Sequence, residues 1–149
     1  MSDTVLYLIP TEPTFVPQAD RMERAQALAR QAFPGAEAVE LLIGDEVTFV
    51  DCGENLQRAA CPRCKTNLLD GRFGELMDVA SKTHFVDRTC TLPCCGERVL
   101  LDDLEYDWSC GFARFRLKIV WPHELPTPEL VRELEGVLEC PLRQVWAYY

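Results

Sequence analysis

The sequence predicts an α+β fold in which a split βαβ frame of the ferredoxin-like kind carries a cysteine-rich insert. Each end of the chain has the residue pattern of a strand, a helix and a strand, in that order. Seven of the eight cysteines lie between residues 52 and 110, which sets the middle of the chain apart from both ends. The frame is therefore expected to be residues 1–51 plus 111–149, with residues 52–110 as the insert. A continuous α+β domain without a separable insert is the alternative.

The first part of the frame is expected to be a strand, a helix and a second strand region. The opening strand is a β-branched and aromatic run that ends at Pro10, and two further prolines predict an extended loop after it. The helix has an alanine-rich stripe at helical spacing and ends at Pro34-Gly35. The strand region is divided at Gly44-Asp45-Glu46, which predicts a hairpin or one long bent strand. These segments cover residues 5–9, 18–33 and 38–50.

The second part of the frame repeats this order with a clearer pattern. Apolar and basic residues alternate over residues 112–121, which predicts a half-buried strand with a basic outer face. Thr127-Pro128 predicts a helix start, because Thr caps the first amides and Pro suits the first helical position. An apolar stripe continues to Leu138, and residues 142–149 read as a final strand.

Within the insert, a short helix, a short strand and an acidic loop are expected. Residues 72–82 place four apolar side chains on one side at helical spacing. Residues 98–101 are strand-like, and residues 102–108 form the predicted loop, with four carboxylates in its first six positions.

The cysteines of the insert have the spacing of a structural zinc site. Cys61-Pro62-Arg63-Cys64 is a Cys-x-x-Cys turn, in which two thiolates converge on one ion. Three later thiols compete for the two remaining positions. The predicted ligands of Zn²⁺ are Cys61, Cys64, Cys94 and Cys95, with Cys90 as the substitute for Cys94. Cys52, Cys110 and Cys140 show no partner spacing and are predicted core residues; buried free thiols are the alternative for the whole set.

Four short motifs extend this prediction: Pro93-Cys94-Cys95-Gly96, Tyr106-Asp107-Trp108, Gly111-Phe112-Ala113-Arg114-Phe115 and Val145-Trp146-Ala147. Together they resemble a group of small bacterial proteins that carry a zinc-ribbon-type knuckle within an otherwise undescribed domain. The resemblance implies that Cys94 and Cys95 are the downstream ligands, and it implies no activity. The chain departs from it at Tyr148-Tyr149, where those proteins have a His-containing end.

The common catalytic motifs are missing from the sequence. Its two histidines, His84 and His123, belong to no metalloprotease or deaminase pattern, and there is no glycine-rich phosphate loop or Gly-x-Ser-x-Gly elbow. A thiolate site with four protein ligands leaves no position for water, so it stabilises rather than catalyses. The expectation leans toward a protein that is not an enzyme, with a metalloenzyme or thiol enzyme of unknown substrate as the alternative.

The charge balance points to a protein partner rather than a nucleic acid. A net charge of −9 opposes binding driven by phosphates, although nucleic-acid binding through the basic residues of the insert is a further alternative. The predicted function is a zinc-stabilised protein-interaction domain, of an immunity-like or adaptor kind, that binds a basic partner. Its predicted contact residues are Asp102, Asp103, Glu105, Tyr106 and Asp107. The chain has no basic leader and no apolar run of membrane-spanning length, which predicts a cytoplasmic protein.

Overall fold

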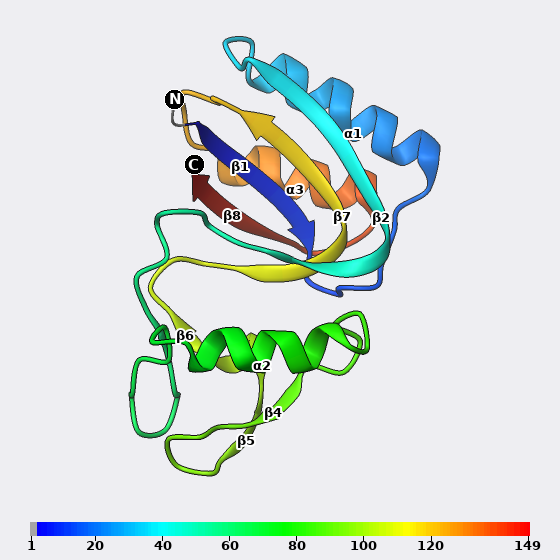
Figure 1. Ribbon diagram of the computed structural model, residues 1–149. Helices are drawn as coiled ribbons and strands as arrows, with labels where there is room; N and C mark the ends of the chain where they lie inside the picture. The colour runs from blue at the N-terminus through cyan, green and yellow to red at the C-terminus, as the bar shows by residue number, and fades with distance from the viewer. Residues whose placement is uncertain (1–2) are drawn as a thin grey trace.

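A four-stranded antiparallel sheet organises the computed structural model, which describes residues 3–149 (Figure 1). Its strands are β1 (Thr4–Pro10), β2 (Ala38–Val50), β7 (Gly111–Val120) and β8 (Leu142–Tyr148), arranged in the order β2-β7-β1-β8. Each neighbouring pair is antiparallel. The α+β class predicted from the sequence is therefore confirmed.

Two helices cover one face of this sheet. Helix α1 (Ala19–Ala32) connects β1 to β2, and α3 (Pro128–Leu138) connects β7 to β8. Each of these strand–helix–strand units has a strand of the other unit between its own two strands. Buried side chains of both helices share one core cluster with β1 and β7, so both helices pack on the same face. No helix within residues 3–149 combines the length and the apolar character needed to cross a bilayer.

The helix boundaries follow the local sequence signals. Helix α1 ends at the residue before Phe33-Pro34, and its buried face is Met22, Ala25 and Ala29. At the start of α3 the Thr127 hydroxyl accepts a hydrogen bond from the Leu130 amide at 3.1 Å, as expected for an N-cap followed by proline.

Strand β2 is one long strand rather than a hairpin. Its register against β7 shifts between Ile43 and Thr48, which marks a bulge at the predicted break. The Arg114 side chain donates from Nε to the Gly44 carbonyl at 3.0 Å, so the bent segment is held against β7.

A smaller lobe lies between β2 and β7 in the chain, below the sheet in Figure 1. It contains one helix, four short strands and a 3₁₀ turn. These elements are β3 (Ala59–Ala60), α2 (Arg72–Ser81), β4 (Thr89–Thr91), β5 (Arg98–Leu100), η1 (Leu101–Asp103) and β6 (Glu105–Tyr106). Strand β3 pairs with β6, and β4 pairs with β5.

The core of this lobe continues into the frame. Its buried cluster includes Val47 of β2 and Phe112 of β7 together with Phe73 of α2. The Phe112 ring lies 5.3 Å from the ring of Phe49 and 5.5 Å from that of Phe85. The lobe therefore shares apolar contacts with the sheet, and the division into residues 52–110 and the rest stays a prediction.

The acidic loop predicted over residues 102–108 is not a loop along most of its length. Leu101 and Leu104 are buried, and this anchors the η1 turn. Tyr106 follows in β6, opposite Ala59 of β3. The apolar residues interspersed among the carboxylates fold this segment onto the lobe.

Candidate metal centre

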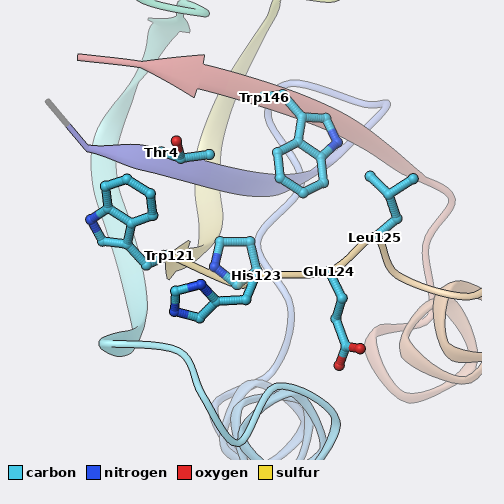
Figure 2. A pocket seen from close by; sticks show the side chains of 7 residues that line it. Thr4, Trp121, His123, Glu124, Leu125 and Trp146 are labelled. Carbon is cyan, nitrogen blue, oxygen red and sulfur yellow. The ribbon is translucent and has the colours of Figure 1, made fainter.

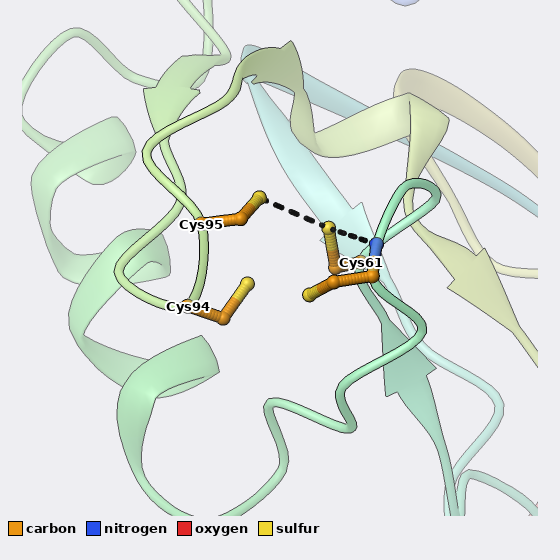
Figure 3. Close-up of side chains that lie close together, drawn as sticks. Cys61, Cys94 and Cys95 are labelled. Carbon is orange, nitrogen blue, oxygen red and sulfur yellow. Dashed lines mark hydrogen bonds between the residues drawn. The ribbon is translucent and has the colours of Figure 1, made fainter.

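Four cysteine sulfurs meet in the small lobe. The Sγ atoms of Cys61, Cys64, Cys94 and Cys95 all lie within 4.8 Å of one another. Figure 3 shows the sulfurs of Cys61, Cys94 and Cys95 directed into a common space. A tetrahedral zinc site with bonds of about 2.3 Å places its sulfurs about 3.8 Å apart. The Cys61–Cys95 separation is 3.6 Å, so the donor set fits a metal ion of this size.

The first pair of sulfurs comes from a tight turn after β3. The backbone amides of Arg63 and Cys64 both point at Cys61 Sγ, each at 3.4 Å. Lys65 has a left-handed backbone, with φ of 65°, and its amide donates to the Cys61 carbonyl at 3.0 Å. The Cys64 amide lowers the pKa of Cys61, because it stabilises the thiolate.

The second pair comes from a turn of the same shape between β4 and β5. Gly96 occupies the position of Lys65 and also has a left-handed φ, of 75°. Leu92 occupies the position of Cys61 and is buried. In the first turn the Cys61 amide donates to the Thr66 carbonyl at 2.9 Å, and in the second the Leu92 amide donates to the Glu97 carbonyl at 2.8 Å. Likewise, the Lys65 amide donates to the Cys61 carbonyl at 3.0 Å, and the Gly96 amide donates to the Leu92 carbonyl at 2.8 Å.

This correspondence explains why the two sulfurs of the second turn come from adjacent cysteines. Cys95 stands where Cys64 stands in the first turn, whereas the other sulfur comes from Cys94, one residue earlier. Leu92 and Cys61 are both buried in the lobe core, but Leu92 has no sulfur to offer at this position. The four cysteines predicted from the sequence are the four whose sulfurs come together, but the equivalence of Leu92 and Cys61 becomes visible only from the backbone hydrogen bonds.

The thiols of the cluster differ in acidity. A hydrogen bond with the Thr66 hydroxyl, at 3.2 Å, lowers the pKa of Cys64 to about 6. Desolvation raises the pKa of Cys94 to about 12. Four thiolates at this separation repel one another, so a bound cation is needed for all of them to ionise together.

An ion pair joins the two turns across the cluster. Arg63 of the first turn lies 2.9 Å from the Glu97 carboxylate of the second. Lys65 forms a second ion pair with Glu105 of β6. Both pairs are solvent-exposed, so each contributes about 1 kcal/mol or less to stability. In the absence of metal, the buried core beneath the turns is therefore the main source of the stability that holds the thiols together.

The remaining candidates lie outside this cluster. Cys90 is in β4, opposite Val99, and does not belong to the four-sulfur group. Neither histidine belongs to it. His84 Nδ1 lies 2.7 Å from a Glu46 carboxylate oxygen, and the His123 ring stacks on Trp121. Within residues 3–149, the cluster is thus composed of thiols alone.

A second pair of sulfurs was missed at the sequence level. Cys52 and Cys110 are both buried, as predicted, but their sulfurs also lie 3.4 Å apart. The pairing of β2 with β7 brings Val50 opposite Gly111, and this register places the two cysteines side by side. Burial raises the pKa of both thiols. The two cysteines stand at the first and last positions of the predicted insert. These positions predict a contact between them only once β2 and β7 are known to pair.

Four of the five predicted partner-binding residues have contacts within the protein. Asp102 pairs with Arg88 at 2.7 Å, and Glu105 pairs with Lys65 as described. The Asp107 carboxylate accepts hydrogen bonds from the backbone amides of Gln57 and Arg58, and the Tyr106 hydroxyl donates to the Leu101 carbonyl. Asp103, at the end of η1, is exposed. Four of these side chains are thus engaged within the lobe, so a partner would have to compete with these contacts.

Comparison with protein-family models, curated proteins and solved structures finds no match to this chain. The resemblance to small bacterial zinc-ribbon-type proteins therefore stays a prediction, and the four-cysteine cluster is the part of it that the structure supports.

Proposed function

We propose that the protein is a non-enzymatic interaction domain stabilised by a structural Zn²⁺ ion. The observation that carries the proposal is the composition of the cluster, in which four protein sulfur atoms lie within 4.8 Å of one another, close enough to surround one metal ion. Such a site leaves no position for a reactive water. Zinc suits it because thiolates are soft ligands and zinc has no redox chemistry of its own.

The fold we propose for this domain is a ferredoxin-like frame with a zinc-ribbon-type lobe. The strand order β2-β7-β1-β8, with one helix in each strand–helix–strand unit, supports the frame. Two similar turns that each supply two thiols support the lobe, and one of these turns connects β4 to β5. Zinc would join these turns, and structural zinc contributes on the order of 10 kcal/mol to folding in small domains.

Metal analysis of the purified protein tests the first part of this proposal. We expect one zinc per chain, lost in Cys64→Ser and retained in the matched control Cys90→Ser, whose thiol lies outside the cluster. X-ray absorption at the zinc edge should show four sulfur neighbours near 2.3 Å. Iron in the same site, or an oxygen ligand that exchanges with solvent, would contradict a closed structural zinc centre.

The interaction we propose is with a basic protein, in an adaptor or immunity-like role. The net charge of −9 supports this sign of partner. Calorimetric titration with purified basic proteins encoded beside this chain, at rising salt, tests it. We expect affinity to fall as salt screens the charges. Absence of binding to any of them, or zinc-dependent turnover of a substrate, would favour the metalloenzyme alternative.

A further inference from the structure

The three tryptophans of the chain gather on one surface, far apart in sequence but adjacent in the fold. Two neighbouring pockets of about 320 and 310 Å³ share the residues Thr4, Leu125 and Trp146. Trp121 lines the first pocket and Trp108 lines the second. We call the two pockets together the tryptophan groove. In Figure 2, Trp121 and Trp146 stand on opposite sides of the first pocket.

Two indole N–H groups of the groove are already hydrogen-bonded within the protein. The Trp121 indole donates to the Asp3 carboxylate at 3.2 Å, and the Trp146 indole donates to the Gln144 side chain at 3.2 Å. The His123 ring stacks on Trp121, with the ring centres 6.1 Å apart. With these N–H groups engaged, the indole rings have their apolar and π surfaces left to offer a ligand, and such surfaces favour apolar groups and cations.

The loop that carries Trp121 is held in an unusual backbone conformation. Trp121 and His123 both have left-handed φ angles, of 54° and 67°. Residues with side chains avoid this region unless the surrounding structure imposes it, and such positions cluster at ligand clamps. Here the Trp121 amide donates to the Thr4 carbonyl at 2.8 Å, which ties the loop to β1. The arrangement holds the Trp121 ring at the pocket wall.

Large apolar side chains of the groove are open to solvent. Leu125 is 74% exposed and Trp108 is 47% exposed. Contiguous patches of exposed apolar side chains on a protein surface often mark interaction sites. The groove is therefore a candidate binding site that is independent of the cysteine cluster.

Carboxylates lie near the groove, and no basic residue lines it. Glu124 lines the first pocket, and Asp3 contacts the Trp121 indole. Neither pocket has a lysine or arginine among its lining residues. Aromatic walls attract ammonium and guanidinium groups, and carboxylates in the neighbourhood favour such cations over anions. A negatively charged ligand would meet repulsion here.

The backbone beside the groove is already occupied, which restricts how a peptide can bind. The Asn55 side chain donates to the Trp146 carbonyl at 3.0 Å. The backbone of Tyr148 is hydrogen-bonded to Cys52 and Glu54. A peptide is therefore recognised through its side chains here, not by adding a strand to this part of β8.

We propose that the tryptophan groove binds an extended segment of the partner protein that carries arginine or lysine, with its cation over the indole faces. This inference deepens the proposed interaction function, on which it rests, and assigns that function to a surface other than residues 102–107.

The test uses tryptophan fluorescence of the full chain, because all three tryptophans report on the groove. The probe is the peptide Ac-(Gly-Arg)3-NH2, with Ac-(Gly-Gln)3-NH2 and Ac-(Gly-Glu)3-NH2 as matched controls. We expect a saturable change with the arginine peptide and none with the other two. Glu124→Gln should weaken its binding about threefold to fivefold, the range of an exposed cation–π or charge contact. Glu133→Gln, the same change on the exposed surface of α3 away from the groove, should leave it unchanged.

Removal of one ring separates binding from folding. Trp121→Leu should weaken the arginine peptide more than Trp121→Phe does, while thermal melting shows that both variants are folded. Equal binding of all three peptides, equal effects of Glu124→Gln and Glu133→Gln, or an unchanged affinity in Trp121→Leu would overturn the groove proposal. If a basic protein still binds in that case, the interaction function survives and only its location is wrong. If the peptide binds the groove but no basic protein does, the interaction function fails and the groove stands.

Discussion

Two pairs of cysteines in this protein have similar geometry and different chemistry. The sulfurs of Cys61 and Cys95 lie 3.6 Å apart, and those of Cys52 and Cys110 lie 3.4 Å apart. The Cys64 amide stabilises the Cys61 thiolate, whereas burial raises the pKa values of Cys52 and Cys110. Cys61 and Cys95 also belong to a group of four thiols that could hold a metal ion, whereas Cys52 and Cys110 belong to no such group among residues 3–149.

Alkylation of the metal-free protein should reveal this difference. At pH 7 we expect iodoacetamide to modify Cys64 first, because the Thr66 hydroxyl holds its pKa near 6. Cys52 and Cys110 should react only after unfolding. Mass spectrometry of peptides at successive times measures the order. Thr66→Val should slow the reaction at Cys64 by raising its pKa toward the ordinary 9.0; equal rates in the two proteins would contradict the assignment.

The same residue gives a pH dependence with a defined sign. The pKa of Cys64 is lower in the folded protein than its ordinary value of 9.0. Its thiolate therefore favours the metal-free fold fully above pH 9, and this contribution is lost as the pH falls toward 6. Urea unfolding at several pH values should show this loss in the original protein and not in Cys64→Ala. If the free energy of unfolding rose relative to Cys64→Ala as the pH fell from 9 toward 6, the predicted direction of the pH dependence would be wrong.

At the scale of elements, two glycines illustrate opposite demands of the backbone. Gly53 has a φ of +61°, and a Cβ atom there would lie 2.2 Å from the Tyr148 carbonyl oxygen. Gly136 lies in α3, and a Cβ atom there would meet no other atom within 4 Å. Gly53 is thus required by a close approach between chain segments, whereas Gly136 weakens its helix.

Alanine substitution at these two positions should change stability in opposite directions. Gly53→Ala is expected to lower the free energy of unfolding by at least about 1–3 kcal/mol, because it adds strain and forces the 53–148 contact apart. Gly136→Ala is expected to raise it by up to about 1 kcal/mol through helix propensity. Chemical denaturation measures both. Destabilisation by Gly136→Ala comparable to that by Gly53→Ala would show that the helix position is more constrained than its surroundings indicate.

The elements themselves were largely predictable, and the contacts between distant elements were not. Periodicity and capping residues located α1, α3 and the frame strands, because these signals are local. Spacing identified the four cluster cysteines for the same reason. The Cys52–Cys110 contact and the gathering of the tryptophans depend on strand register and on loop positions. Residues 102–108 were predicted as a loop, but the η1 turn and strand β6 occupy part of this segment, because Leu101 and Leu104 are buried and anchor it.

For the whole molecule, the question is how far the small lobe depends on metal. The cluster joins two turns of the lobe, yet the lobe core includes Val47 and Phe112 from the sheet. Loss of the ion should therefore weaken the lobe strongly and the adjoining ends of β2 and β7 slightly.

Hydrogen exchange after chelation measures this dependence. We expect amides of α2, β4 and β5 to lose protection, while the centres of β1 and β7 keep theirs. Cys90→Ser with its metal should exchange like the original protein. Simultaneous loss of protection throughout the sheet would show one cooperative unit and would count against the predicted division at residues 52 and 110.

The bulge of β2 also affects how copies of the protein meet. Strand β2 is one edge of the sheet, and an unbroken edge strand is a template for strand pairing with another copy. The register break between Ile43 and Thr48 interrupts that template, and it contains the acidic pair Asp45 and Glu46. At the other edge, Gly53 bridges to Tyr148 of β8. Both edge strands thus carry a feature that interrupts continuous pairing with a strand of another copy.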